Sequence, residues 1–169
     1  SRSAEGPVVV VDVVAAIEAS DAWNQEEARL IELAQQMQVE SEAMKDEITT
    51  IQNDLQSGIL TPDSPERMRL EDQLLEKANA FRAMQRTMEL RINSENARIL
   101  EQLHGLAQKA MASLSVERGW TVVLPRTPFT VPESLDPNIV RSAILDQSVL
   151  HAEPVADVTT IVTSRMNEL

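Results

Sequence analysis

Two long runs of heptad spacing, separated by a single break, limit what this 169-residue chain can fold into. In each run, selected positions recur at alternating steps of three and four residues. A sustained spacing of 3.5 residues is typical of helices that wind around one another rather than pack onto a globular core. The first predicted seam consists of Trp23, Glu27, Leu30, Ala34, Met37, Ser41, Met44, Ile48, Ile51 and Leu55. The second consists of Leu74, Ala78, Phe81, Gln85, Met88, Ile92, Glu95, Ile99, Gln102 and Leu106.

The break between the two runs has the composition of a helix–turn–helix junction. Gly58 can end the first helix in the left-handed conformation. Ser64 is a helix N-cap, and Pro65 after it suits the first helical position. We therefore predict an antiparallel helical hairpin over residues 20–118, with its tip near residues 56–64.

The charges of the two helices differ. Residues 21–55 carry nine acids and two bases, whereas residues 65–118 carry eight acids and nine bases. Paired helices of this kind are complementary along their edges, although an exposed pair contributes only a few tenths of a kcal/mol. An equally plain interpretation is that both faces are charged for solubility.

The overall composition limits the possible partners. A net charge of -12 argues against nucleic acid, because phosphate binding depends on clustered Lys and Arg. With two Trp, two Phe and no Tyr, a long hairpin has few large side chains for a compact core, so we expect self-association. The absence of cysteine excludes disulfides and thiolate metal sites. No stretch is long enough to span a bilayer.

Short β-branched runs flank the hairpin. Residues 8–14 predict a strand buried on both faces, and residues 119–125 predict a second strand that lies beside it at the base of the hairpin. Residues 148–152 predict a third strand. We therefore expect an α+β protein in which residues 1–19 and 119–169 form a β-rich body completed by association.

Three shorter helices are expected around these strands. One leads into the hairpin at residues 14–20, and another follows a proline-containing loop at residues 138–146. A terminal helix over residues 154–169 has apolar residues at helical spacing, with Asp157 or Thr159 as its N-cap. We expect the terminal helix to cover the small sheet.

Taken in order, these segments resemble the Skp/OmpH family of periplasmic chaperones. The resemblance covers most of the chain except residues 127–147, which look like an insertion of unknown role. The residues that carry it are Val9-Val10-Val11-Asp12, Ser20-Asp21-Ala22-Trp23, Ile59-Leu60-Thr61-Pro62-Asp63-Ser64-Pro65-Glu66-Arg67, Glu117-Arg118-Gly119, Val122-Val123-Leu124, Val149-Leu150-His151-Ala152 and Val158-Thr159.

The resemblance implies a homotrimer in which small strands from three subunits form one β body. Three helical arms then surround a cavity that holds unfolded outer-membrane proteins apart without ATP. It also implies a periplasmic location, and we take a signal peptide or a tag to have been removed before residue 1. The best-known family members are basic, whereas this chain is acidic. The usual client set, membrane contact and any lipopolysaccharide site therefore do not carry over directly.

Two other functions remain open. A structural coiled-coil adaptor or spacer of the cell envelope would bind one defined partner at the arm tips. A prefoldin-like cytosolic chaperone would share the helical arms but lack a signal peptide. Polar seam positions such as Ser41, Gln85 and Gln102 loosen the predicted coiled coil, which favours a flexible holdase over a rigid spacer.

Methionines and the residues of the tip are the candidates for contact with client proteins. Methionine has a flexible thioether that adapts to varied apolar surfaces. Met37, Met44 and Met88 lie on the predicted seam and are expected to pack between the helices. Met84 lies beside the seam and Met68 lies near the tip, so these two, with Ile59 and Leu60, are the candidate contact residues.

The sequence gives little support for catalysis or metal binding. Glu101 and His104 match half of a di-metal site in a helix bundle, but such a site needs a second pair, which the sequence lacks. His151 stands alone in a predicted strand. The sequence has no Gly-rich phosphate loop and no serine nucleophile motif. We therefore predict a protein that is not an enzyme and uses neither a metal nor a cofactor.

Overall fold

The computed structural model describes residues 5–130, 132–133 and 136–169. The chain divides into two compact units. The body unit consists of Ser1–Glu26 and Ile99–Leu169, and the arm unit consists of Glu27–Arg98. The domain boundaries expected from the sequence, with residues 20–118 as one part, remain a prediction.

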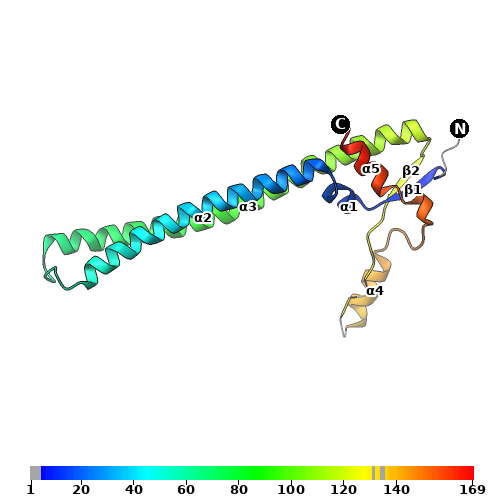
Figure 1. Ribbon diagram of the computed structural model, residues 1–169. Helices are drawn as coiled ribbons and strands as arrows, with labels where there is room; N and C mark the ends of the chain where they lie inside the picture. Colours follow the sequence, from blue (N-terminus) through cyan, green and yellow to red (C-terminus); the bar gives the residue numbers. More distant parts are fainter. Residues whose placement is uncertain (1–4, 131, 134–135) are drawn as a thin grey trace. The chain divides into compact units, whose positions relative to one another are not determined.

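Two long helices form the arm unit and continue into the body unit. Helix α2 (Asp21–Gln56) and helix α3 (Pro65–Arg118) lie side by side (Figure 1). Two ion pairs, Arg29–Glu95 and Glu47–Lys77, fix their register. Moving 18 residues forward along α2 from Arg29 to Glu47 moves 18 residues back along α3 from Glu95 to Lys77. The helices are therefore antiparallel without a slip between these points, which confirms the predicted hairpin.

The turn between the helices has the expected local chemistry. Gly58 has a φ of +73°, in the left-handed region that favours glycine. The Ser64 hydroxyl accepts a hydrogen bond from the backbone N–H of Arg67 at 3.2 Å, and Pro65 is the first residue of α3. The side-chain cap satisfies a donor that has no partner inside the helix, so α3 begins at the predicted residue.

The seam of the arm differs in detail from the prediction. Met37, Ser41 and Ile51 are buried as expected, but Glu27, Ala34 and Gln85 are exposed. Their neighbours Glu26, Leu33 and Met84 are half-buried instead. Two seam positions that are seven residues apart have one further seam position between them. A residue at i+3 or one at i+4 can occupy it, because either choice gives an average spacing of 3.5 residues. The packing of the partner helix decides between them.

The body unit contains two parallel strands. Strand β1 (Val8–Val11) pairs with strand β2 (Val122–Pro125), with Val8 opposite Val122 and Val11 opposite Pro125. The strand predicted over residues 8–14 is therefore too long. Asp12 ends β1 because its side chain accepts a hydrogen bond from the backbone N–H of Ala15 at 3.0 Å and caps helix α1 (Val13–Glu18).

The third strand predicted at residues 148–152 is wrong. These residues form no strand, and Leu150 is 83% exposed. The second edge of β1 is instead bonded to the chain before the last helix. Val10 makes an isolated parallel bridge with Asp157, and its carbonyl accepts a hydrogen bond from the N–H of Val158 at 2.9 Å. An apolar run forms a strand only where a partner edge lies within reach.

Helix α5 (Thr159–Met166) lies against α1 and β1 and closes the core of the body unit. Val158 and Val162 are fully buried, and the Thr163 hydroxyl donates to the carbonyl of Ala16 at 3.0 Å. A short 3-10 helix, η1 (Pro154–Ala156), precedes α5. The terminal helix is therefore confirmed, although its α-helical part is shorter than residues 154–169. Asp157, one of the two predicted caps, accepts a hydrogen bond from the N–H of Thr159.

The part of α3 in the body unit follows a different spacing from the predicted seam. Gln102 was predicted on the seam but is exposed. The buried residues follow steps of four, four, three and four, which is wider than the 3.5-residue period of a coiled coil. They are Ile99, Leu103, Ala107, Ala110 and Leu114. Here α3 therefore packs as a helix of a small globular core.

Helix α4 (Pro137–Leu145) lies where a helix over residues 138–146 was predicted. Asp136 caps it by accepting a hydrogen bond from the N–H of Asn138 at 2.9 Å. The helix has an apolar side, but none of its residues is buried. The segment predicted as an insertion thus contains its own helix within the body unit.

Candidate functional site

The arm unit exposes many large apolar side chains. A two-helix hairpin buries only one stripe of each helix, so apolar residues outside the seam stay in water. Ile59 at the turn is 84% exposed, and Leu90 on α3 is 70% exposed. The exposed large apolar residues of this unit are Ile31, Val39, Ile59, Met68, Leu75 and Leu90. We call this set the apolar arm surface.

The four candidate contact residues do not form one cluster. Ile59 and Met68 belong to the apolar arm surface, whereas Leu60 between them is half-buried. Met84 is also half-buried and lies further along α3, where it lines a pocket. The structure therefore separates residues near the turn from one residue in the middle of the arm.

The pocket at Met84 lies between the two helices of the arm. It has a volume of about 250 Å³. Each helix contributes four residues with the same spacing, i, i+3, i+4 and i+7, which places them along one edge of that helix. The lining residues are Leu33, Gln36, Met37 and Glu40 from α2, and Met84, Thr87, Met88 and Arg91 from α3. We call this site the methionine pocket.

Sequence reasoning missed the methionine pocket because it assigned Met37 and Met88 only to the core and placed Ala34, rather than Leu33, on the seam. Met37 is 9% exposed, and Met88 is half-buried. The matching i, i+3, i+4, i+7 patterns on both helices were a usable signal. They become informative only once the register of the hairpin brings the two patterns together.

Charged contacts flank the methionine pocket along the arm. The Arg29 guanidinium lies 2.6 Å from the Glu95 carboxylate, and Arg98 lies 3.0 Å from the same group. Hydrogen bonds from Arg29 and then from Arg98 lower the pKa of Glu95. On the other side of the pocket, Lys77 lies 2.5 Å from Glu47. These pairs hold the helix register at both ends of the pocket.

The charge complementarity expected between the helices is only partly found. In Glu47–Lys77 the acid lies on α2 and the base on α3, as expected. In Arg29–Glu95 the base lies on α2 and the acid on α3. Within the described residues, Arg82, Arg86 and Arg91 on α3 form no ion pair, and all three are exposed. The solubility interpretation therefore fits these three side chains.

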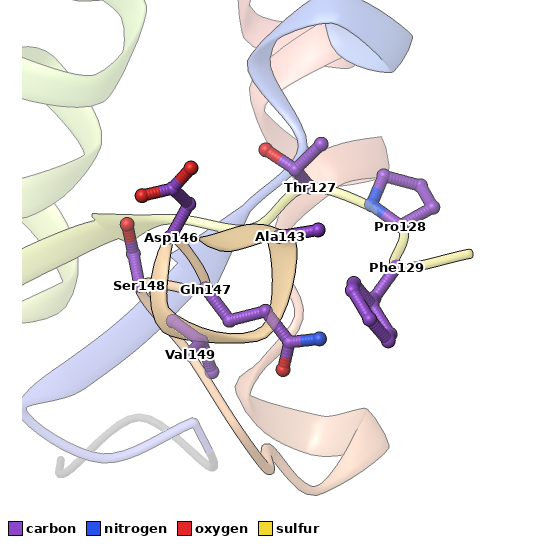
Figure 2. Close-up of a pocket in the computed structure, with 8 residues that line it drawn as sticks. All are labelled: Thr127, Pro128, Phe129, Ala143, Asp146, Gln147, Ser148 and Val149. Carbon is purple, nitrogen blue, oxygen red and sulfur yellow. The ribbon is translucent and has the colours of Figure 1, made fainter. Parts of the chain in front are cut away.

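Figure 2 shows a second pocket, in the body unit, between the loop at residues 127–129 and the end of α4. Its volume is about 270 Å³. The Phe129 ring and the Gln147 amide lie on one side of it, while the Asp146 carboxylate points away from them. The pocket lies within the predicted insertion and gathers no group of charged side chains typical of an active site.

A third pocket of about 390 Å³ lies at the carboxyl ends of the two strands and includes Arg126, Asp157 and Thr159. Partial burial opposes ionisation of Asp157. Hydrogen bonds from the Thr159 hydroxyl and N–H and the nearby Arg126 outweigh this effect and lower its pKa. Arg126 lies 3.0 Å from Asp157, so these groups satisfy one another. We therefore interpret this ion pair as one that stabilises the fold.

The residues that the sequence suggested for metal binding do not form a metal site in the structure. Glu101, His104 and His151 are all exposed. Across residues 5–130, 132–133 and 136–169, no group of three or more His, Cys, Asp or Glu side chains is arranged to hold a metal ion.

Among the helices of the described residues, none combines the length and the hydrophobicity needed to cross a membrane.

Comparison with known proteins connects this architecture to a family. The model of the family of outer membrane proteins described as OmpH-like matches residues 7–166. Among solved structures, the chain is similar to a candidate outer membrane chaperone (OmpH-like) from Caulobacter crescentus CB15. The TM-score is 0.76 at 16% sequence identity, and the match covers 96% of this chain and 84% of that one. At this identity the likeness concerns the fold.

No curated protein matches the sequence at a significant level. The assignment therefore rests on the family match, which spans both the strands of the body unit and the helices of the arm unit. It confirms the resemblance predicted from the ordered segments of the sequence. The chain belongs to the OmpH-like family.

Proposed function

We propose that this protein is an ATP-independent holdase chaperone that shields unfolded outer-membrane proteins in the periplasm. One observation carries the proposal. The arm unit keeps several large apolar side chains in water, including Val39 at 67% and Leu75 at 62% exposure. Each of these side chains can contact the apolar side chains of an unfolded chain. Membership of the OmpH-like family supports a chaperone role.

The physical basis of holding is a set of weak apolar contacts. An unfolded chain exposes apolar side chains that would otherwise drive aggregation. Separate residues such as Ile31, Ile59 and Leu90 can each cover part of such a chain without a fixed geometry. Binding to the unfolded state alone lowers the concentration of free aggregation-prone chain without an energy source.

We propose that the working form is a homotrimer. The body unit exposes Val122 and Leu124, which share one face of β2, at 43% and 36%, and Val14 of helix α1 at 62%. Among the residues that the structure describes, strand β2 pairs only with β1. An open strand edge invites further pairing, and association of bodies around an axis would cover both features.

The acidic charge affects the choice of partner. A net charge of -12 disfavours long-range attraction to anionic lipid surfaces and to nucleic acid, although α3 carries basic residues of its own. We therefore propose that the protein acts on soluble clients and that its contacts are mainly apolar.

A structural adaptor is the second candidate function. The observation that favours it is the exposure of Ile59, which at 84% is a single prominent apolar contact at the turn of the hairpin. An adaptor would use such a contact for one defined partner. A holdase would use the whole apolar arm surface for many clients.

An aggregation assay separates the two functions. An outer-membrane β-barrel protein is diluted from urea with and without this protein, and light scattering is followed at low and moderate salt. The assay is repeated with an unrelated unfolded protein. We expect suppression of both at about one oligomer per client, with weak dependence on salt. Continued aggregation of both clients at several-fold excess of soluble oligomer would refute the holdase and favour the adaptor.

A further inference from the structure

We propose that the methionine pocket of the arm anchors an aromatic side chain of the unfolded client. This inference rests on the proposed holdase function and assigns one specific contact within it. The site is the pocket of about 250 Å³ lined by the buried or half-buried Leu33, Met37, Met84 and Met88 and by the exposed Gln36, Glu40, Thr87 and Arg91, which we take as its rim.

The size of the pocket fits an aromatic ring. A dry protein cavity of about 150 Å³ lined by apolar side chains is large enough to bind benzene. The methionine pocket has a larger volume but is partly open to solvent, so it can take a phenylalanine or tyrosine side chain that stays attached to an extended backbone.

The chemistry of the lining also favours an aromatic occupant. Three thioethers, from Met37, Met84 and Met88, line one pocket. A thioether sulfur makes favourable contacts with aromatic rings, and the flexible side chain adapts to rings that enter at different angles. Adaptability matters here because a holdase must accept many sequences. Branched aliphatic side chains would shape the pocket for one occupant only.

This chain supplies no ring of its own for the pocket. The sequence has no Tyr, and Phe81 is the only aromatic residue of the arm unit. The Phe81 ring contacts Lys45, whose Nζ lies 5.8 Å from the ring centroid, and Phe81 does not line the pocket. An aromatic occupant would therefore come from outside the arm unit. Outer-membrane β-strands carry girdles of aromatic residues, so the proposed clients provide such rings at regular intervals.

The rim of the pocket suits a peptide rather than a free apolar molecule. Gln36 and Thr87 offer an amide and a hydroxyl, and Glu40 and Arg91 carry opposite charges. Such groups can hydrogen-bond to the N–H and C=O groups of an extended backbone whose side chain enters the pocket. The lining thus offers apolar groups to a side chain and polar groups to the backbone that carries it.

The test follows the seven methionine methyl groups by NMR in the full-length protein with isotope-labelled methionine. The probe is a soluble peptide of alternating apolar and polar residues with one central Phe, and its control is the same peptide with Leu in that position. We expect ring-current shifts at Met37, Met84 and Met88, little change at Met68, and weaker binding of the Leu peptide.

Substitutions then test the thioether contact. Met84→Gln keeps the length of the side chain and removes the sulfur, and we expect the affinity for the Phe peptide to fall about two- to tenfold. Met68→Gln, at an exposed methionine outside the pocket, is the matched control and should leave the affinity unchanged. Unaltered far-UV circular dichroism and thermal melting show that each variant is folded.

Several results would overturn the proposal. One is equal binding of the Phe and Leu peptides, and another is the same shift at Met68 as at Met84. A third is a shift in the pocket that depends on protein concentration without peptide, which would assign the site to a second copy of this chain. If aggregation of unfolded clients is still suppressed in these cases, only the aromatic anchor fails. If suppression is also absent, the holdase function fails with it.

Discussion

Leu114 gives the sharpest test of how the body unit is built. Its side chain is 1% exposed on the face of α3 that forms the core, whereas Val116, two residues later on the same helix, is 88% exposed. The Leu114→Ala substitution removes a fully buried side chain and leaves a cavity. Substitutions of this type lower the free energy of unfolding by about 2.7–5.0 kcal/mol.

The matched control is Val116→Ala in the same helix. An exposed position without special contacts changes the free energy of unfolding by less than about 0.5 kcal/mol. Alanine also has a higher helix propensity than valine, which offsets part of any loss. For a chain of this size, about 1 kcal/mol corresponds to roughly 2–4 °C in Tm, so Leu114→Ala should lower Tm by about 5–20 °C.

Tryptophan fluorescence is the appropriate assay because both tryptophans, Trp23 and Trp120, belong to the body unit. Urea titrations of both variants are compared with the parent protein at one subunit concentration, because association affects apparent stability. A loss below about 1 kcal/mol for Leu114→Ala would refute the assignment of this face to the core. A loss of several kcal/mol for Val116→Ala would show that its side chain is covered in the assembled protein.

Two further predictions concern the turn and the sheet. Gly58→Ala should lower the free energy of unfolding by about 1 kcal/mol in thermal melts. The reason is the φ of +73°, since nothing within 4 Å of the added methyl group obstructs it. An unchanged melt would mean that the turn is not held in the left-handed conformation. The fold lowers the pKa of Asp157 from its ordinary value of 3.8. The ionised carboxylate therefore stabilises the folded state above pH 3.8, and this stability is lost as the pH falls through the folded-state pKa. Asp157→Asn should therefore be less stable than the parent in urea titrations at pH 7, and the difference should shrink in acid; a constant difference would contradict this reasoning.

The methionines illustrate the limit of reasoning from sequence about the candidate site. The sequence placed Met37 and Met88 on the seam, and their low exposure agrees with that. It placed Met84 beside the seam, but Met84 is half-buried there, and all three line one pocket. The pocket depends on which α2 residue faces which α3 residue. The heptad pattern of each helix contains no information about this pairing, whereas the Glu47–Lys77 contact fixes it.

The strands also separate what the sequence predicts from what tertiary contacts decide. The β-branched run at residues 8–14 indicated a strand, and β1 lies within it. Its end at Val11 follows from the hydrogen bond that Asp12 makes as a helix cap. The run at residues 148–152 also contains apolar residues, but it pairs with neither strand, and the chain around Asp157 occupies the second edge of β1. Composition measures a tendency to form a strand, and the available edge decides whether it forms.

The sequence by itself determined the hairpin and its turn. The 3.5-residue period, Gly58 and the Ser64-Pro65 pair act within a few residues of chain and depend on backbone conformation and capping. Only the tertiary structure decided which intermediate positions of the seam are buried, where β1 ends and which segment covers its second edge. These outcomes depend on contacts between residues far apart in the chain, such as Val10 with Val158, whose energies appear only when both partners are in place.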